Sequence, residues 1–102
     1  MIVTSTESLT REHVARTLRV YLSEYVLGDR TARISERDDR LGDIFSRTTN
    51  PLGRNAAALE FATFVAQTFT LPFNEVASYD PNELNIDETA LLIYDRVRGG
   101  KR

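Results

Sequence analysis

The feature that most constrains the fold is an apolar run at residues 51–73, PLGRNAAALEFATFVAQTFTLPF. Pro51 and Gly53 precede it as turn formers, and the side-chain oxygen of Asn55 is suited to cap a helix by accepting from its first free amides. Pro72 ends the run, because the residue before a proline avoids helical backbone angles. Spacings of three and four predict one broad buried stripe: Leu59, Phe61, Ala62, Val65, Ala66 and Phe69. We therefore expect residues 55 to about 69 to form the central, most buried helix.

The composition is that of one small domain with little net charge. The 102 residues predict a single domain over 1–102, with flexible ends at 1–9 and 99–102. Thirteen basic and 15 acidic residues give a net charge of -2, which offers no general attraction to nucleic acid. The absence of cysteine excludes disulfides and thiolate sites. No apolar run approaches the roughly 20 residues of a membrane span, and the start lacks a signal-peptide pattern, so we expect a cytoplasmic protein without membrane contact.

A first amphipathic helix is predicted at residues 11–27. Thr10 is placed to cap it, and Gly28 to end it. Its apolar residues recur at helical spacing: Val14, Leu18, Tyr21, Leu22, Tyr25 and Val26.

Residues 28–50 are predicted to form a long connecting loop. Loops of this length within a small domain are often functional or mobile. We expect a surface loop held to the core by Ile34, Leu41 and Phe45, with one short helical turn at LGDIF.

Two further helices follow Pro72. A short one is predicted to end near Ser78, and a last one is capped by Asn85 or Asp87 and ended by Gly99 and Gly100. No segment alternates as a strand does. The predicted fold class is therefore all-α, a small up-and-down four-helix bundle with a long loop between its first and second helices.

The order of these elements resembles the acyl or peptidyl carrier proteins, which are small acidic four-helix bundles. LEFATFVAQTFTLPFNEV resembles their second helix and the turn after it, although Phe69 and Pro72 are closer together than is usual. ELNIDETALLIYDRVRG resembles their fourth helix, and RDDRLGDIF resembles the acidic stretch before the carrier motif. The first helix fits in length and amphipathicity.

The carrier motif itself is absent. The family presents an Asp-Ser-Leu-like turn whose serine hydroxyl takes a phosphopantetheine arm. The corresponding turn here is Gly53-Arg54-Asn55-Ala56, which places Asn55 or Ala56 at the serine position and Arg54 at the usual acidic position. Neither Asn55 nor Ala56 has a hydroxyl to form the phosphodiester, so we expect no phosphopantetheine or other cofactor. An engineered serine-to-alanine change at Ala56 is an open alternative.

Other chemistry has little support in the sequence. Ser8 has too few residues before it for a first helix, and Ser46 lacks a following leucine, so neither is favoured as an attachment site. His13 is the lone histidine, in a first helical turn, with no second catalytic group, so no enzymatic activity is predicted. The remaining candidate, a carboxylate cluster, is better explained as solvated than as a metal site: Asp38, Asp39 and Asp43.

The resemblance implies a function in protein–protein interaction. Carrier proteins meet their enzymes along the second helix, and those enzymes are of ketosynthase, acyltransferase, adenylating or condensation type. Phe64 is predicted to lie off the buried stripe, where an exposed ring could anchor a partner. The corresponding partner-binding residues are Arg54, Asn55, Ala58, Glu60, Thr63, Phe64 and Gln67. Two alternatives stay open: a functional carrier with an unusual attachment residue, and an unrelated helical adaptor or regulatory subunit.

Overall fold

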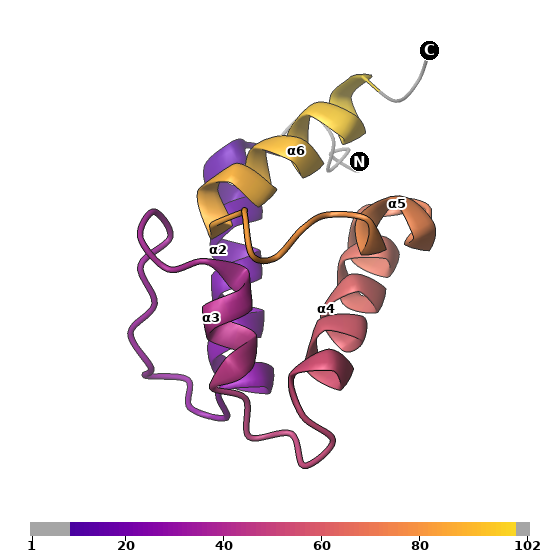
Figure 1. The fold of residues 1–102 in the computed structure, drawn as a ribbon. Helices are drawn as coiled ribbons and strands as arrows, with labels where there is room; N and C mark the ends of the chain where they lie inside the picture. The colour runs from indigo at the N-terminus through magenta and orange to yellow at the C-terminus, as the bar shows by residue number, and fades with distance from the viewer. Residues whose placement is uncertain (1–8, 100–102) are drawn as a thin grey trace, which may run out of the picture.

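The computed structural model describes residues 9–99, and every regular element in this range is helical (Figure 1). The predicted all-α class is confirmed. The elements are α2 (Arg11–Tyr21), the π-helix η1 (Leu22–Val26), α3 (Leu41–Ser46), α4 (Arg54–Phe69), α5 (Phe73–Ala77) and α6 (Ile86–Gly99). Gly99 is helical, whereas 1–8 and 100–102, which make up most of the predicted flexible ends, lie outside the described residues.

Helix α2 and η1 form the predicted first helix. The Thr10 side chain accepts from the amide of His13 at 3.0 Å, which confirms the predicted cap. From Leu22 the helix widens to π geometry, and Gly28 follows with a φ of 69°. The wider turn changes which residues face the core, so Ser23 is buried and Tyr25 is 67% exposed. The prediction that Tyr25 belongs to the buried stripe is therefore wrong.

The short helix α3 lies at the centre of the core. Leu41, Ile44 and Phe45 are almost fully buried, although the helix has six residues. Ile34 is also buried, so the three predicted anchors of the long loop are confirmed. Most of the other fully buried side chains come from α2, η1 and α6, including Val14, Leu18, Leu22, Ile86 and Ile93.

Backbone hydrogen bonds attach the end of the long loop to the segment before α6. The amide of Leu41 donates to the carbonyl of Leu84 at 2.9 Å, and the amide of Gly42 donates to the carbonyl of Pro81 at 2.8 Å. The amide of Asp87 donates to the carbonyl of Glu36 at 3.0 Å. These bonds satisfy backbone groups that the core would otherwise leave without water, and they fix where α3 begins.

Asn85 connects the same two segments through its side chain. Its Oδ1 accepts from the amide of Glu88 at 2.7 Å, and Glu88 Oε1 accepts from the amide of Asn85 at 3.0 Å. This reciprocal pair is a capping box, and it identifies Asn85 as the predicted cap of α6. Asn85 Nδ2 also donates to the carbonyl of Arg37 at 2.7 Å, across 48 residues of sequence.

Helix α4 forms as predicted but begins at Arg54, one residue earlier than expected. Gly53 has a φ of 93° and precedes the helix, so Asn55 lies within the first turn and does not cap it. Only glycine adopts this backbone conformation readily, which explains the earlier start.

The prediction that α4 is the central, most buried helix is also wrong. It packs against α3 and α5, while α2 packs most extensively against α6 (Figure 1). Four of its residues are buried, and Leu59, which was predicted to be buried with them, is 57% exposed. Leu59 instead lies at the edge of a groove between α4, α3 and α5, where more than half of its surface stays in water.

We expect Asn85→Ala to lower the free energy of unfolding by about 1–2 kcal/mol, because it removes a helix cap and leaves the Arg37 carbonyl without its donor. Urea unfolding followed by circular dichroism measures this change. Asn74→Ala is the matched control, since Asn74 is exposed and makes no side-chain hydrogen bond in the described range; its effect should stay within about 0.5 kcal/mol. Equal effects of the two substitutions would contradict the role assigned to Asn85.

Candidate functional site

The residues predicted to bind partners lie on two flanks of α4 and on its outer face. Asn55 and Ala58 lie on the flank that faces α3 and α5, and they line a groove there. Phe64 lies on the opposite flank, with its ring against Tyr21 of α2. Thr63 and Gln67 are exposed. The structure therefore does not gather the seven predicted residues into one patch.

The groove beside Asn55 has a volume of about 350 Å³ and a mostly apolar lining. Its wall is formed by side chains of α3, α4, α5 and the segment after α5: Leu41, Phe45, Asn55, Ala58, Leu59, Phe61, Ala62, Val76, Ala77, Tyr79 and Pro81. The small side chains Ala58 and Ala62 leave this space open. Apolar grooves of this size with few polar groups are typical of binding sites.

The first turn of α4, Arg54-Asn55-Ala56, contains no hydroxyl. Arg54 and Asn55 are exposed, and Arg54 Nη2 donates to Asn82 Oδ1 at 3.2 Å. The side chain of Ser46 is already engaged, because its Oγ donates to the carbonyl of Gly42 at 2.9 Å. Ser8 lies outside the described residues.

The outer face of α4 carries little charge. Arg54 and Glu60 are its only charged residues in sixteen. The hydroxyl of Thr63 donates to the carbonyl of Leu59 at 3.0 Å, so it offers little to a partner as a donor. Leu59 leaves more than half of its surface in water, and sequence patterning missed it because its position fits the apolar spacing. A neutral, partly apolar helix face is the kind of surface that a protein partner covers.

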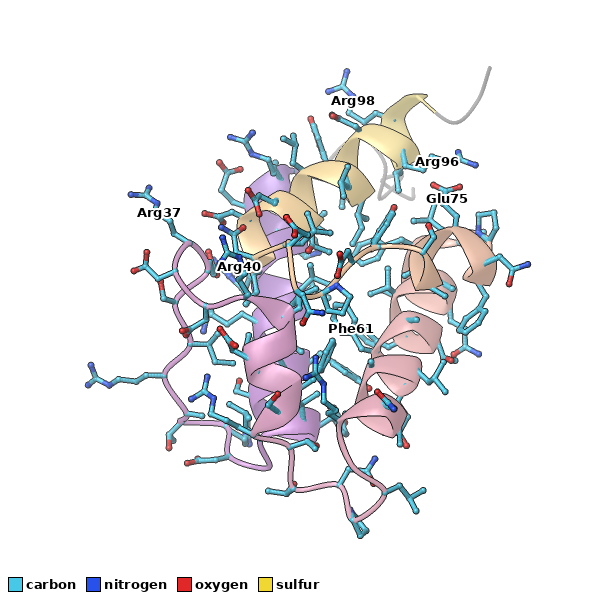
Figure 2. The ribbon with its side chains drawn as sticks, viewed as in Figure 1. Arg37, Arg40, Phe61, Glu75, Arg96 and Arg98 are labelled. Carbon is cyan, nitrogen blue, oxygen red and sulfur yellow. The ribbon has the colours of Figure 1, made fainter. Side chains whose placement is uncertain are left out.

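An aromatic cluster joins α4 to α2 and α3. Phe61 points from α4 towards α3, as Figure 2 shows, and its ring meets that of Phe45 edge-on at 5.5 Å. On the other side, the Tyr21 ring stacks between Phe64 at 4.2 Å and Tyr25 at 5.2 Å. Phe64 is half-buried in this stack, so it is not the freely exposed ring that we considered as an anchor. The helical spacing put Tyr21 and Tyr25 together on the apolar side of the first helix, but only Tyr21 packs against the core, and Tyr25 is 67% exposed.

Burial raises the pKa of the Tyr21 phenol above its ordinary value of 10.0. The carboxylate of Glu60 adds to this effect, and Tyr25 contributes least, because a second negative charge disfavours the phenolate. Glu60 also accepts a long hydrogen bond of 3.4 Å from Asn50 Nδ2. Glu60 therefore lies close to the aromatic stack and contributes a negative charge to this flank of α4.

The carboxylate cluster in the long loop does not converge. Asp39 Oδ2 accepts from the amide of Ser35 at 2.8 Å, which gives this side chain a local structural role. Among residues 9–99, no three histidine, aspartate or glutamate side chains are placed to hold a metal ion together. His13 is exposed at the start of α2. No helix in the described range is both long and apolar enough to cross a bilayer.

Comparison with known proteins returned no match to a family model, to a curated protein or to a solved structure.

Replacing Glu60 by glutamine should move the pKa of Tyr21 back towards 10.0, because the nearby negative charge is removed while the burial remains. NMR titration of the tyrosine ring carbons between pH 8 and 12 follows each phenol separately. Tyr79 serves as the internal control, because burial and Glu75 raise its pKa independently of Glu60. A Tyr21 titration that is unchanged in the variant would contradict this electrostatic coupling.

Proposed function

We propose that this chain is a carrier-like protein of the four-helix type that bears no phosphopantetheine and acts by binding biosynthetic enzymes through α4. The observation that carries the proposal is the exposed, nearly uncharged face of α4, where Leu59 is 57% exposed. An apolar side chain of this size exposed on a helix gains free energy when a partner covers it.

The order and lengths of the helices support the carrier-like part of the proposal. The continuous helix of α2 and η1, then α4, the short α5 and α6 follow the order of the four carrier helices. In this correspondence α3 belongs to the long first loop. The ion pair of Glu75 with Arg96, at 2.8 Å, ties the short helix α5 to α6 (Figure 2).

The first turn of α4 supports the absence of an arm. A carrier uses a serine at this point, where the free amides and the dipole of the helix favour a phosphate. Here Gly53, Arg54, Asn55 and Ala56 occupy the turn, and none of them has a hydroxyl. The chain would therefore keep the surface that enzymes recognise and lack the group that they modify.

The partners that the resemblance implies are ketosynthase, acyltransferase, adenylating and condensation enzymes. The low charge of α4 suggests which kind of interaction would hold such a partner. Carrier–enzyme contacts of a mainly acidic helix would depend on salt, whereas contacts of a helix with one arginine and one glutamate in sixteen residues depend mainly on apolar burial. Leu59 would then be the residue whose burial contributes most, with Thr63 and Gln67 at the rim.

We expect Leu59→Glu to weaken binding to such an enzyme by at least about tenfold, because it replaces a buried apolar contact with a desolvated charge. Calorimetry against a panel of the four enzyme classes measures the affinity. Leu92→Glu is the matched control, since Leu92 is 41% exposed on α6 and should leave the affinity unchanged. Absence of binding across the panel would favour the helical-adaptor alternative. Equal losses of affinity in both variants would show that α4 is not the interface.

A further inference from the structure

A second exposed apolar surface lies on the flank of α2, away from the outer face of α4. It is a shallow groove of about 300 Å³ between α2, η1 and Phe64. Val20, which is 46% exposed, and Tyr25, which is 67% exposed, both line it. The Tyr21 ring also lines it, stacked between Tyr25 and Phe64. The proposed enzyme contact through α4 does not use Val20 or Tyr25.

The charges on this groove are arranged symmetrically about Val20. Arg16 lies four residues before it and Glu24 four residues after it, and all three line the groove. Val20 lies one α-helical turn after Arg16, and Glu24 follows about one turn later in η1. Because all three line the same groove, their side chains form one row along it. Along the helix axis, the row therefore consists of the positive Arg16, the apolar Val20 and the negative Glu24.

We propose that this groove is the interface of a homodimer in which the α2 helices of two copies pack antiparallel about a twofold axis near Val20. In such an arrangement each residue meets the one equally far from the axis on the other side. Arg16 of each copy then faces Glu24 of the other, and the two Val20 side chains meet at the axis. The surface is therefore complementary to itself in both charge and apolar character.

The surroundings of Glu24 are compatible with this pairing. Its carboxylate contacts Arg30 at 3.2 Å, but the Arg30 side chain is 83% exposed, so that ion pair is weak and leaves room for a second cation. The exposed ring of Tyr25 lies next to Glu24 in sequence, at the end of the groove away from Arg16. An incoming guanidinium would meet the carboxylate and come near the face of this ring. The area is small, so the dimer should be weak and reversible.

Sedimentation equilibrium of the full chain from about 10 μM to about 1 mM covers the range in which small interfaces associate. The wild-type mass should rise towards that of a dimer. Arg16→Glu and Glu24→Arg should each weaken association by about tenfold or more, because each creates two like-charge contacts. Arg33→Glu is the control for the charge change, since Arg33 is exposed and lies outside the groove.

Mixing the two variants provides the decisive measurement. An equimolar mixture of Arg16→Glu and Glu24→Arg chains restores opposite charges at both contacts and should associate as strongly as the wild type. Circular dichroism confirms that each variant is folded. A wild type that stays monomeric throughout, a single variant that associates normally, or a mixture that stays monomeric would each overturn the proposal.

Discussion

The fold depends on the attachment of the long loop to the amino end of α6. Asn85 caps α6 through Glu88 and also holds the carbonyl of Arg37, while Leu41 and Gly42 take backbone partners from the segment before the helix. Without these bonds, α3 would be a single hydrophobic turn at the end of a charged loop, too short to be stable alone. With them, it places three large side chains at the centre of the core.

The position of α3 determines what α4 is free to do. Because α3 fills the centre, α4 needs to contribute only one narrow stripe to the core, which includes Phe61 and Val65. The remaining surface of the helix, including Leu59, faces a groove or water. The apolar surface of α4 therefore extends beyond the stripe that the core covers, and the proposed function depends on this excess.

Much of the fold was predictable from the sequence, because helix periodicity and caps are local signals. The helices at 11–27, near 55–69, after Pro72 and after Asn85 all form. The predictions fail where the burial of a residue or the start of a helix depends on residues distant in sequence or on uncommon backbone angles. The π turn exposes Tyr25, a positive φ at Gly53 moves the start of α4, and Leu59 lies at the edge of a groove between α4, α3 and α5. For the candidate site, the absence of a hydroxyl at Asn55 and Ala56 can be read from the sequence. The groove and the aromatic stack depend on tertiary contacts that no local pattern encodes.

We propose a carrier-like chain without the attachment residue, and one experiment separates this proposal from its alternatives. Intact mass after incubation with a promiscuous phosphopantetheinyl transferase and coenzyme A tests it most directly, when the wild type is compared with a variant that combines Arg54→Asp, Asn55→Ser and Ala56→Leu. In the first turn of α4, Arg54 and Asn55 are exposed and Ala56 is half-buried. None of the three belongs to the buried core, so the changes rebuild the family's turn at the surface of the helix. The account predicts one added arm on the variant and none on the wild type. An arm on the wild type, or none on the variant, would contradict it.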